Sequence, residues 1–185
     1  MKLILIICLI SFLTGCFGQN SKPPEAVRIN TPSSASTKIS KEQAIVFSLT
    51  GDGKVYILIG DSAHKSTIIK NINTERELNL NDSEIARFNR MDLIGMPLRK
   101  LKTWLDLKEP MPASQMEGIP ISDSNNNELM HWVKAIQDAF KGENPDRLNL
   151  LVKGDQLAKY PAFKAIKQAF KKNDIYKFRI VTNPE

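Results

Sequence analysis

A strand, a helix and a second strand follow one another in the last third of the chain, and this order limits the possible folds more than any other feature. Residues 147–153 form an apolar run that predicts the first strand, and Gly154-Asp155 supplies a turn after it. Pro161 lies near the start of the helix, whose apolar residues recur on one face. Residues 175–181 predict the second strand. Short turns on both sides of the helix favour parallel strands with a right-handed crossover.

Two more strand patterns lie further toward the N-terminus. Residues 44–50 and 54–60 are rich in β-branched and aromatic side chains, and Gly51-Asp52-Gly53 between them tolerates positive φ, so they predict a β-hairpin. A calcium or phosphate loop is the functional alternative for these glycines, but no carboxylate cluster supports it. Together these patterns predict an α+β fold: a small mixed β-sheet with helices packed on it, an N-terminal β-hairpin and a C-terminal βαβ unit.

The signals between these units are weaker. Residues 61–80 predict a loop that includes one strand around residues 66–72. Residues 82–91 open with Asp-Ser-Glu, which offers N-caps for a short helix. Pro97 suits the first turn of a second helix, and residues 109–122, with their three prolines, predict an extended loop.

A polar segment at residues 123–128 opens like an EF-hand loop. Such a loop needs Gly at its sixth position and Glu at its twelfth, but here these positions hold Glu128 and Lys134, which excludes calcium. The segment instead predicts an Asx-rich N-cap for a helix over residues 128–140. Trp104, in the preceding helix, is interpreted as a core anchor rather than a platform for a ligand.

The first sixteen residues predict a signal peptide that directs the chain for export. Lys2 precedes residues 3–13, which are mostly apolar. At 1.5 Å per residue this run makes about 16 Å of helix against about 30 Å of hydrocarbon, so it is too short to span a bilayer. The motif that follows, Leu13-Thr14-Gly15-Cys16, resembles the lipobox of bacterial lipoproteins, in which the Cys thiol takes a diacylglyceryl group.

This interpretation divides the chain into three parts. Residues 1–15 are a signal peptide, and residues 16–40 are the lipidated Cys16 followed by a flexible tether rich in proline and serine. Residues 41–185 are the folded domain. We expect a membrane lipoprotein, with acyl chains such as palmitate, in the cell envelope of a diderm bacterium and with its domain in the periplasm. An ordinary secretory signal with an incidental Cys16 is the alternative.

The patterns at the two ends of the domain share a further feature. Over residues 148–182 a strand ends in Gly154-Asp155, Tyr160 opens a helix, and Asn173-Asp174-Ile175 leads into a strand that closes in Val181-Thr182. With Gly51-Asp52-Gly53-Lys54-Val55-Tyr56 as a first hairpin, this order resembles the periplasmic domain of the ExbD/TolR family of biopolymer-transport proteins. The resemblance covers about half of the domain.

Two departures limit what the resemblance implies. Family members carry an N-terminal transmembrane helix with an intramembrane Asp that serves proton-driven work, whereas residues 3–13 contain no acid and are predicted to be removed. Residues 61–127 are more than the compact family domain needs and resemble a helical insertion. The resemblance therefore implies an interaction role in an ion-gradient-driven, TonB-type transmembrane transport system. Its implied partners are ExbB-like and TonB-like proteins and a second copy in a homodimer.

No catalytic constellation is visible in the sequence. His64, in a predicted polar loop, and His131, off the apolar stripe of its helix, lack motif partners and are interpreted as surface or capping residues. Cys8 would leave with the signal peptide, and Cys16 would be lipidated. We therefore expect no enzyme, no metal and no cofactor. A ligand-binding or sensing lipoprotein of the same fold is the main alternative, and a hydrolase with a non-standard site is a further one.

The last predicted strand offers a surface at which a partner protein can bind. An exposed strand over residues 175–181 can accept an extended partner segment by β-augmentation. Its candidate contact residues are Tyr176, Lys177, Phe178 and Arg179. The two cations discourage promiscuous pairing and favour an acidic partner, although they also fit an edge that is merely protected from aggregation.

The positive charge is concentrated in the same region. The chain carries a net charge of +6, and residues 141–185 hold ten basic and five acidic residues. They lack aromatic interleaving and a Gly-rich RNA-binding motif, so the charge favours lipid headgroups or an acidic protein over nucleic acid. With 42% hydrophobic and 25% charged residues, the composition excludes collagen, coiled coil and polytopic membrane proteins.

Overall fold

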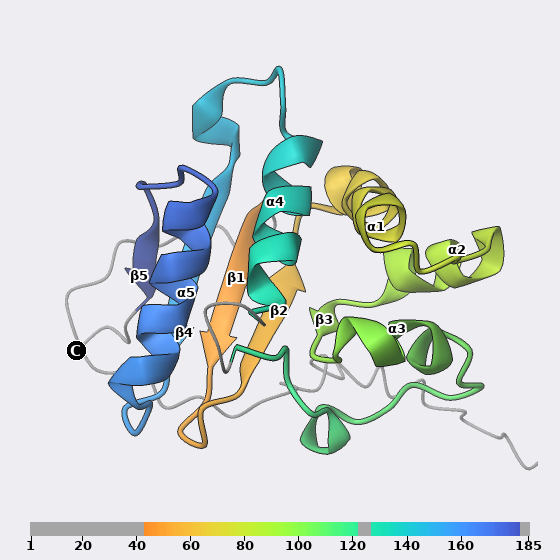
Figure 1. Cartoon of the computed structure of the whole chain (residues 1–185), viewed down its shortest axis with the longest axis horizontal. Coiled ribbons are helices and arrows are strands. Elements are labelled where there is room, and N and C mark those ends of the chain that lie inside the picture. Colours follow the sequence, from red (N-terminus) through yellow and green to blue (C-terminus); the bar gives the residue numbers. More distant parts are fainter. Residues whose placement is uncertain (1–42, 122–126, 182–185) are drawn as a thin grey trace, which may run out of the picture.

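The chain folds around one mixed β-sheet (Figure 1). A computed structural model describes residues 43–121 and 127–181. The five strands stand in the order β3-β2-β1-β4-β5. Their bounds are β1 Ala44–Leu49, β2 Val55–Ile59, β3 Leu93–Ile94, β4 Asn149–Gly154 and β5 Arg179–Val181. The predicted α+β class, a mixed sheet with helices packed on it, is confirmed.

The two predicted strand units meet in the middle of this sheet. β1 and β2 pair antiparallel as the predicted hairpin, with Leu49 opposite Val55. β4 and β5 pair in parallel across α5 (Tyr160–Lys172), as the βαβ pattern requires. β1 then pairs with β4 in parallel from Ala44 to Leu49, which joins the hairpin to the βαβ unit. Every residue of β1 is buried, since a central strand has a neighbour on each side and packs on both faces.

The helices pack on the sheet and on one another (Figure 1). α4 (Leu129–Ala139) and α5 lie side by side across the sheet, and α1 (Ser62–Arg76) packs beside α4. α2 (Asp82–Arg90) and α3 (Leu98–Leu105) extend this layer beyond β3. The main core unites the odd-numbered residues of β1 with the buried faces of the helices, including Trp104 and Trp132. Trp104 is 3% exposed, which confirms it as a core anchor.

The loop and strand predicted over residues 61–80 are wrong, because most of this span is α1. The β-branched residues around 66–72 pointed to a strand, but Ile68, Ile69 and Ile72 follow helical spacing and are fully buried. Asp61 begins the helix as its N-cap, and its side chain accepts hydrogen bonds from the backbone N–H groups of Ala63 and His64. Tertiary burial of the isoleucines therefore outweighs their strand propensity.

Polar side chains fix the starts of the next helices. Asn81 and Glu84 form a capping box at the start of α2, one residue before the predicted caps. Glu128 begins α4, and its carboxylate accepts a hydrogen bond at 2.7 Å from the N–H of Leu98, the first residue of α3. The helices predicted over 82–91 and 128–140 and after Pro97 are thus confirmed within a residue or two at each end.

The last strand is shorter than predicted. Strand geometry is confined to Arg179–Val181, so the prediction of a strand from residue 175 is wrong. Asp174 has a φ of 55°, and the N–H of Ile175 bonds to the carbonyl of Phe170, which closes the end of α5. The Phe178 ring lies 5.1 Å from that of Phe170. Ile175 is buried and Phe178 packs against α5, whereas Tyr176 and Lys177 between them are exposed.

The insertion predicted over residues 61–127 carries α1, α2, β3, α3 and a short 3₁₀ turn at Ala113–Gln115. Residues 109–121 otherwise lack helix and strand, apart from an isolated bridge between Val55 and Ile119. The signal peptide, the lipobox, the tether and most of the Asx-rich cap at 123–128 lie outside the described residues. Within the described ranges, no helix is both long and apolar enough to cross a membrane.

Candidate functional site

The open edge of the sheet is formed by β5. β4 occupies one side of this strand, with Leu151 opposite Arg179 and Lys153 opposite Val181. On its other side β5 has no strand partner among the residues that the structure describes. β5 is therefore an edge strand of the described sheet, as β3 is at the other end, and an edge strand is where a further strand can be added.

The four predicted contact residues have different environments. Tyr176 is 73% exposed, and Arg179 lies exposed on β5 itself. Lys177 is exposed, but its Nζ lies 2.7 Å from a carboxylate oxygen of Asp146, and this contact lowers the pKa of that carboxyl. Phe178 is half-buried, and its ring lies 5.1 Å from that of Phe170. Tyr176 and Arg179 are thus the two that remain available beside the edge.

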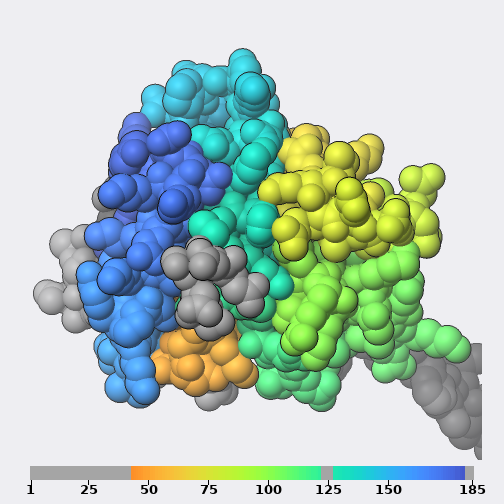
Figure 2. All heavy atoms as spheres, viewed as in Figure 1, coloured from red at the N-terminus to blue at the C-terminus, as the bar shows by residue number. Residues whose placement is uncertain are grey.

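Exposed apolar side chains gather in the same unit. The large hydrophobic side chains that are exposed within the described residues are Leu157, Tyr160, Tyr176 and Ile180. All of them belong to the stretch from the turn after β4 through β5, which Figure 2 draws in blue. Sequence reasoning named Tyr176 but missed the other three, although the apolar character of Leu157 beside a turn was a visible signal.

A chemically distinct cluster surrounds His64, which is 8% exposed on α1 rather than in a polar loop. Its Nδ1 lies 3.0 Å from Asp61 Oδ2, and its Nε2 lies 2.9 Å from Glu143 Oε1. The ring stacks on Phe140 with a centroid separation of 3.8 Å. Glu143 also lies 3.6 Å from the Nε of Arg147. The predicted surface or capping role of His64 is therefore wrong.

The charges around His64 change its pKa. Burial lowers the pKa, but the hydrogen bonds and negative charges of Asp61 and Glu143 together outweigh burial and raise it above the ordinary 6.5. The two carboxylates contact opposite nitrogens of the ring, so they cannot share one metal ion with it. No group of three or more His, Cys, Asp or Glu side chains within residues 43–121 and 127–181 is arranged to hold a metal. The cluster therefore acts as a bridge between the start of α1 and the end of α4.

His131 lies at the surface, as the sequence predicts. Its Nδ1 lies 2.8 Å from Glu75 on α1, and its side chain is 31% exposed. It thus joins two helices at their outer side. His64 and His131 lie on different helices and have separate acidic partners, so they do not form a common site.

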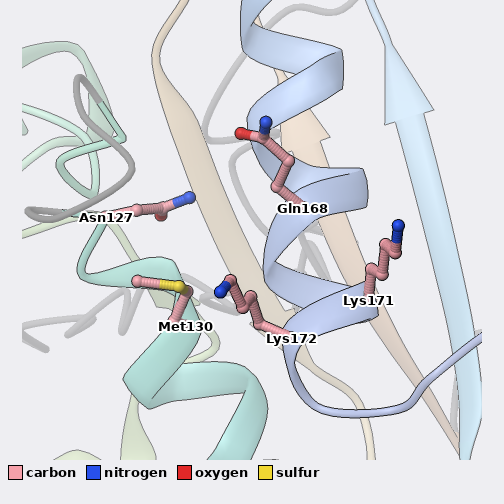
Figure 3. Close-up of a pocket in the computed structure, with 5 residues that line it drawn as sticks. All are labelled: Asn127, Met130, Gln168, Lys171 and Lys172. Carbon is pink, nitrogen blue, oxygen red and sulfur yellow. The ribbon is translucent and has the colours of Figure 1, made fainter.

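A surface hollow of about 350 Å³ lies between α4 and α5 (Figure 3). It is lined by Asn127, Met130, Gln168, Lys171 and Lys172. Asn127 is 3% exposed, and its amide is engaged by the carbonyl of Ala165 and the N–H of Leu129. Lys172 extends toward Met130. The hollow thus combines an apolar side chain with cations, which suits a small anionic molecule with an apolar part.

Comparison with protein-family models, with curated proteins and with solved structures finds no match to this chain.

Proposed function

We propose that the chain is a non-catalytic, lipid-anchored, ExbD-like component or accessory of an ion-gradient-driven envelope transport system of the TonB type, acting through protein contacts. The observation that carries the interaction role is the open edge of β5, with Tyr176 and Arg179 exposed beside it. The partners, ExbB-like and TonB-like proteins, come from the sequence resemblance. The anchor comes from Cys16 and its lipobox.

The way the two strand units join supports the family part of this proposal. The segments that carry the resemblance, residues 51–56 and 148–182, are separated by more than ninety residues. In the fold, the hairpin and the βαβ unit become neighbours through the pairing of β1 with β4. The segment between the hairpin and the βαβ unit, which carries α1 to α4, contributes only β3 to the sheet, at the edge opposite β5. The resembling parts therefore form a contiguous structural unit.

The edge also favours a particular kind of partner. A strand that joins β5 would gain backbone hydrogen bonds, and the neighbouring side chains would decide which sequence is accepted. Arg179 forms no ion pair within 4 Å among the described residues, although its charge contributes to the lowered pKa of Asp146, whereas Lys177 lies 2.7 Å from that carboxylate. An extended segment with acidic residues would therefore pair with Arg179 and compete for Lys177.

Site-specific crosslinking in the native envelope tests this function. A photo-crosslinking amino acid at position 179 should capture ExbB-like or TonB-like proteins, or a second copy of the chain. The same group at Lys70, an exposed residue of α1, is the matched control and should capture none of them. Mass spectrometry of the purified adducts identifies the partner. A monomer that gives no adduct at position 179 and copurifies with a small molecule would sink the proposal.

A periplasmic ligand-binding or sensing lipoprotein is the second candidate, and the hollow between α4 and α5 is the observation that favours it. Native mass spectrometry of the protein extracted from its own envelope would show a bound molecule. Met130→Glu places an anion in the hollow and should remove an anionic ligand, whereas crosslinking at position 179 should be unaffected. Loss of a bound molecule in Met130→Glu would favour the ligand-binding candidate, whereas adducts from position 179 to ExbB-like or TonB-like proteins would favour the transport candidate.

A further inference from the structure

α5 presents a basic stripe to the outside. Tyr160, Lys164, Lys167 and Lys171 follow one another at spacings of four, three and four residues, which places them on one side of the helix, and all four are exposed. Leu157 stands three residues before this stripe and is 79% exposed. These five residues are called the α5 face below.

The turn before α5 holds Leu157 outward. The N–H of Leu157 bonds to the carboxylate of Asp155 at 2.8 Å, and the N–H of Ala158 bonds to the carbonyl of the same residue at 3.0 Å. These bonds fix a tight turn at the end of β4. Leu157 therefore projects from a defined position beside the first turn of α5, next to Tyr160, which is 67% exposed.

The charge of this region is one-sided. Residues 159–172 contain five lysines and no acidic residue. Residues 43–121, by contrast, carry ten basic and ten acidic side chains. Lys164, Lys167 and Lys171 have no carboxylate partner within the described ranges, although the Nζ of Lys167 lies 5.9 Å from the centre of the Phe163 ring. The α5 face is therefore a field of unneutralised positive charge with apolar groups at one end.

We propose that the α5 face docks the domain on an anionic lipid bilayer. Lysine ammonium groups attract acidic headgroups as point charges, and their long stems reach the headgroup level while the helix stays above it. Leu157 would enter the acyl boundary and Tyr160 would lie at the interface, where an amphipathic ring is favoured. A protein interface would instead place its apolar residues at the centre with a polar rim around them.

This inference rests on the proposed function for one point, the lipid anchor. The diacylglyceryl group at Cys16 would already hold the chain at the membrane, because two acyl chains suffice for stable attachment. The anchor would hold the domain near the bilayer, and the α5 face would fix which side of the domain meets it. The β5 edge lies beside this face and stays open for a partner.

Fluorescence quenching in vesicles measures the docking. The full lipidated chain carrying Leu157→Cys, labelled with bimane, is reconstituted in phosphatidylcholine vesicles with or without about 30 mol% phosphatidylglycerol, together with nitroxide-labelled lipid. The label at position 157 should be quenched in the anionic vesicles only, and 1 M salt should reverse this since it shortens the Debye length to about 3 Å. A label at Thr103→Cys, exposed on α3 on the other side of the molecule (Figure 2, green), should stay unquenched.

Charge variants identify the residues responsible. Each lysine near an anionic surface changes binding about five-fold, so the triple variant Lys164→Gln/Lys167→Gln/Lys171→Gln should weaken docking about 100-fold. The matched control removes three exposed cations elsewhere, Lys70→Gln/Arg99→Gln/Lys108→Gln, and should leave docking unchanged. Circular dichroism confirms that both variants are folded.

Several outcomes would overturn the inference. Position 157 staying unquenched in anionic vesicles would do so, as would equal quenching at positions 157 and 103. Loss of quenching in the control triple variant would show that docking depends on the net charge of the domain and not on the α5 face. Crosslinks from the α5 face to an acidic protein, without quenching, would assign this surface to a protein. Failure of the anchor is measured separately: the intact mass would then lack the lipid, and Cys16→Ser would change the mass only by the exchange of sulfur for oxygen and would leave membrane association unchanged.

Discussion

The imidazole of His64 lies between the carboxylates of Asp61 and Glu143 and against the ring of Phe140. A neutral imidazole carries one N–H, so one of the two carboxylates would then face a lone pair. The protonated ring donates to Glu143 through Nε2, is attracted by the charge of Asp61, which lies 3.0 Å from Nδ1 outside hydrogen-bond geometry, and stacks its own charge on an aromatic face. Protonation therefore strengthens the link between the start of α1 and the end of α4.

The raised pKa of His64 predicts a pH-dependent stability. Because the folded pKa lies above the unfolded value near 6.5, the contribution is complete below that pH and is lost as the pH rises through the folded pKa. His64→Gln should lower the free energy of unfolding by about 2 kcal/mol at pH 5.5, and by less at pH 8.5. Urea denaturation at both pH values measures this difference.

His131→Gln is the matched control, since His131 also faces a carboxylate, that of Glu75, but is 31% exposed. Its effect should stay within about 0.5 kcal/mol at either pH, as for other exposed pairs. A pH dependence that survives unchanged in His64→Gln would show that another group is responsible.

Glu84 is the most deeply buried acid in the described ranges, at 2% exposure. Its carboxylate accepts from the N–H of Asn81 at 2.6 Å and lies 2.8 Å from the Nζ of Lys102 on α3. Burial raises the pKa of Glu84, but these bonds outweigh burial and hold it below the ordinary 4.5. The carboxylate thus caps α2 and ties it to α3, and its contribution is lost only as the pH falls through the lowered pKa.

Replacing this charge tests the capping role. Glu84→Gln keeps the shape of the side chain but removes the charge, and should lower the free energy of unfolding by about 2 kcal/mol at pH 7. Glu117→Gln, in the exposed pair with Lys100, should change it by less than about 0.5 kcal/mol. Chemical denaturation of both variants decides the matter, and equal losses would contradict the role of burial.

At the scale of elements, β3 reaches the sheet only because residue 95 lacks a side chain. A Cβ at Gly95 would overlap the ring of Tyr56, which is 3% exposed and bonded through its hydroxyl to the carbonyl of Met116. The ring is therefore unable to move aside without breaking a buried contact. The short strand that ends the sheet at Leu93–Ile94 depends on this close approach.

Gly95→Ala should lower the free energy of unfolding by about 1–3 kcal/mol, as overpacking of a filled core does. Gly154→Ala is the matched control, because a Cβ there meets nothing within 4 Å and no positive φ requires glycine. Its effect should be close to zero or slightly stabilising, since alanine restricts the unfolded chain. A neutral Gly95→Ala would mean that the Tyr56 ring has room to shift.

Elements were predictable from sequence where their signals were local. The hairpin glycines, the caps before α2 and α4 and the apolar stripe of α5 each lie within a few residues of the element that they define. α1 was missed because Ile68, Ile69 and Ile72 have strand propensity and become helical through burial against distant residues. β5 was predicted too long for a similar reason, since Phe178 packs on α5 instead of joining the sheet.

The candidate sites were likewise predictable from sequence only where their residues lie close together in the chain. The charged edge was visible because Lys177 and Arg179 lie within one strand pattern. The bridge through His64 was not, because Glu143 lies 79 residues away and only the packing of α1 against α4 brings the two together. The spacing of Asp61 and His64 was a local signal, since it matches an N-cap and the third residue of a helix.

At the scale of the whole molecule, charge and apolar exposure are gathered at one end of the sheet while the opposite end is balanced. The β5 edge and the α5 face lie side by side there, and both need the domain to be held at a membrane surface for their proposed roles. An anchor at Cys16 would supply this, because the tether limits the distance between domain and bilayer without using any residue of the fold.

Substitution of the two cysteines tests the anchor directly. Cys16→Ser should abolish metabolic labelling with palmitate and release the protein from the membrane fraction, because the thiol that forms the thioether is gone. Cys8→Ser is the matched control, since residue 8 lies in the predicted signal peptide, and it should leave labelling and membrane association unchanged. The protein found free of membranes should still give crosslinks at position 179 to purified partner, because the edge belongs to the fold. Unchanged membrane association of Cys16→Ser would refute the lipobox. It would also refute the scheme in which Cys16 anchors the domain, the α5 face docks it on the bilayer and the β5 edge binds a partner.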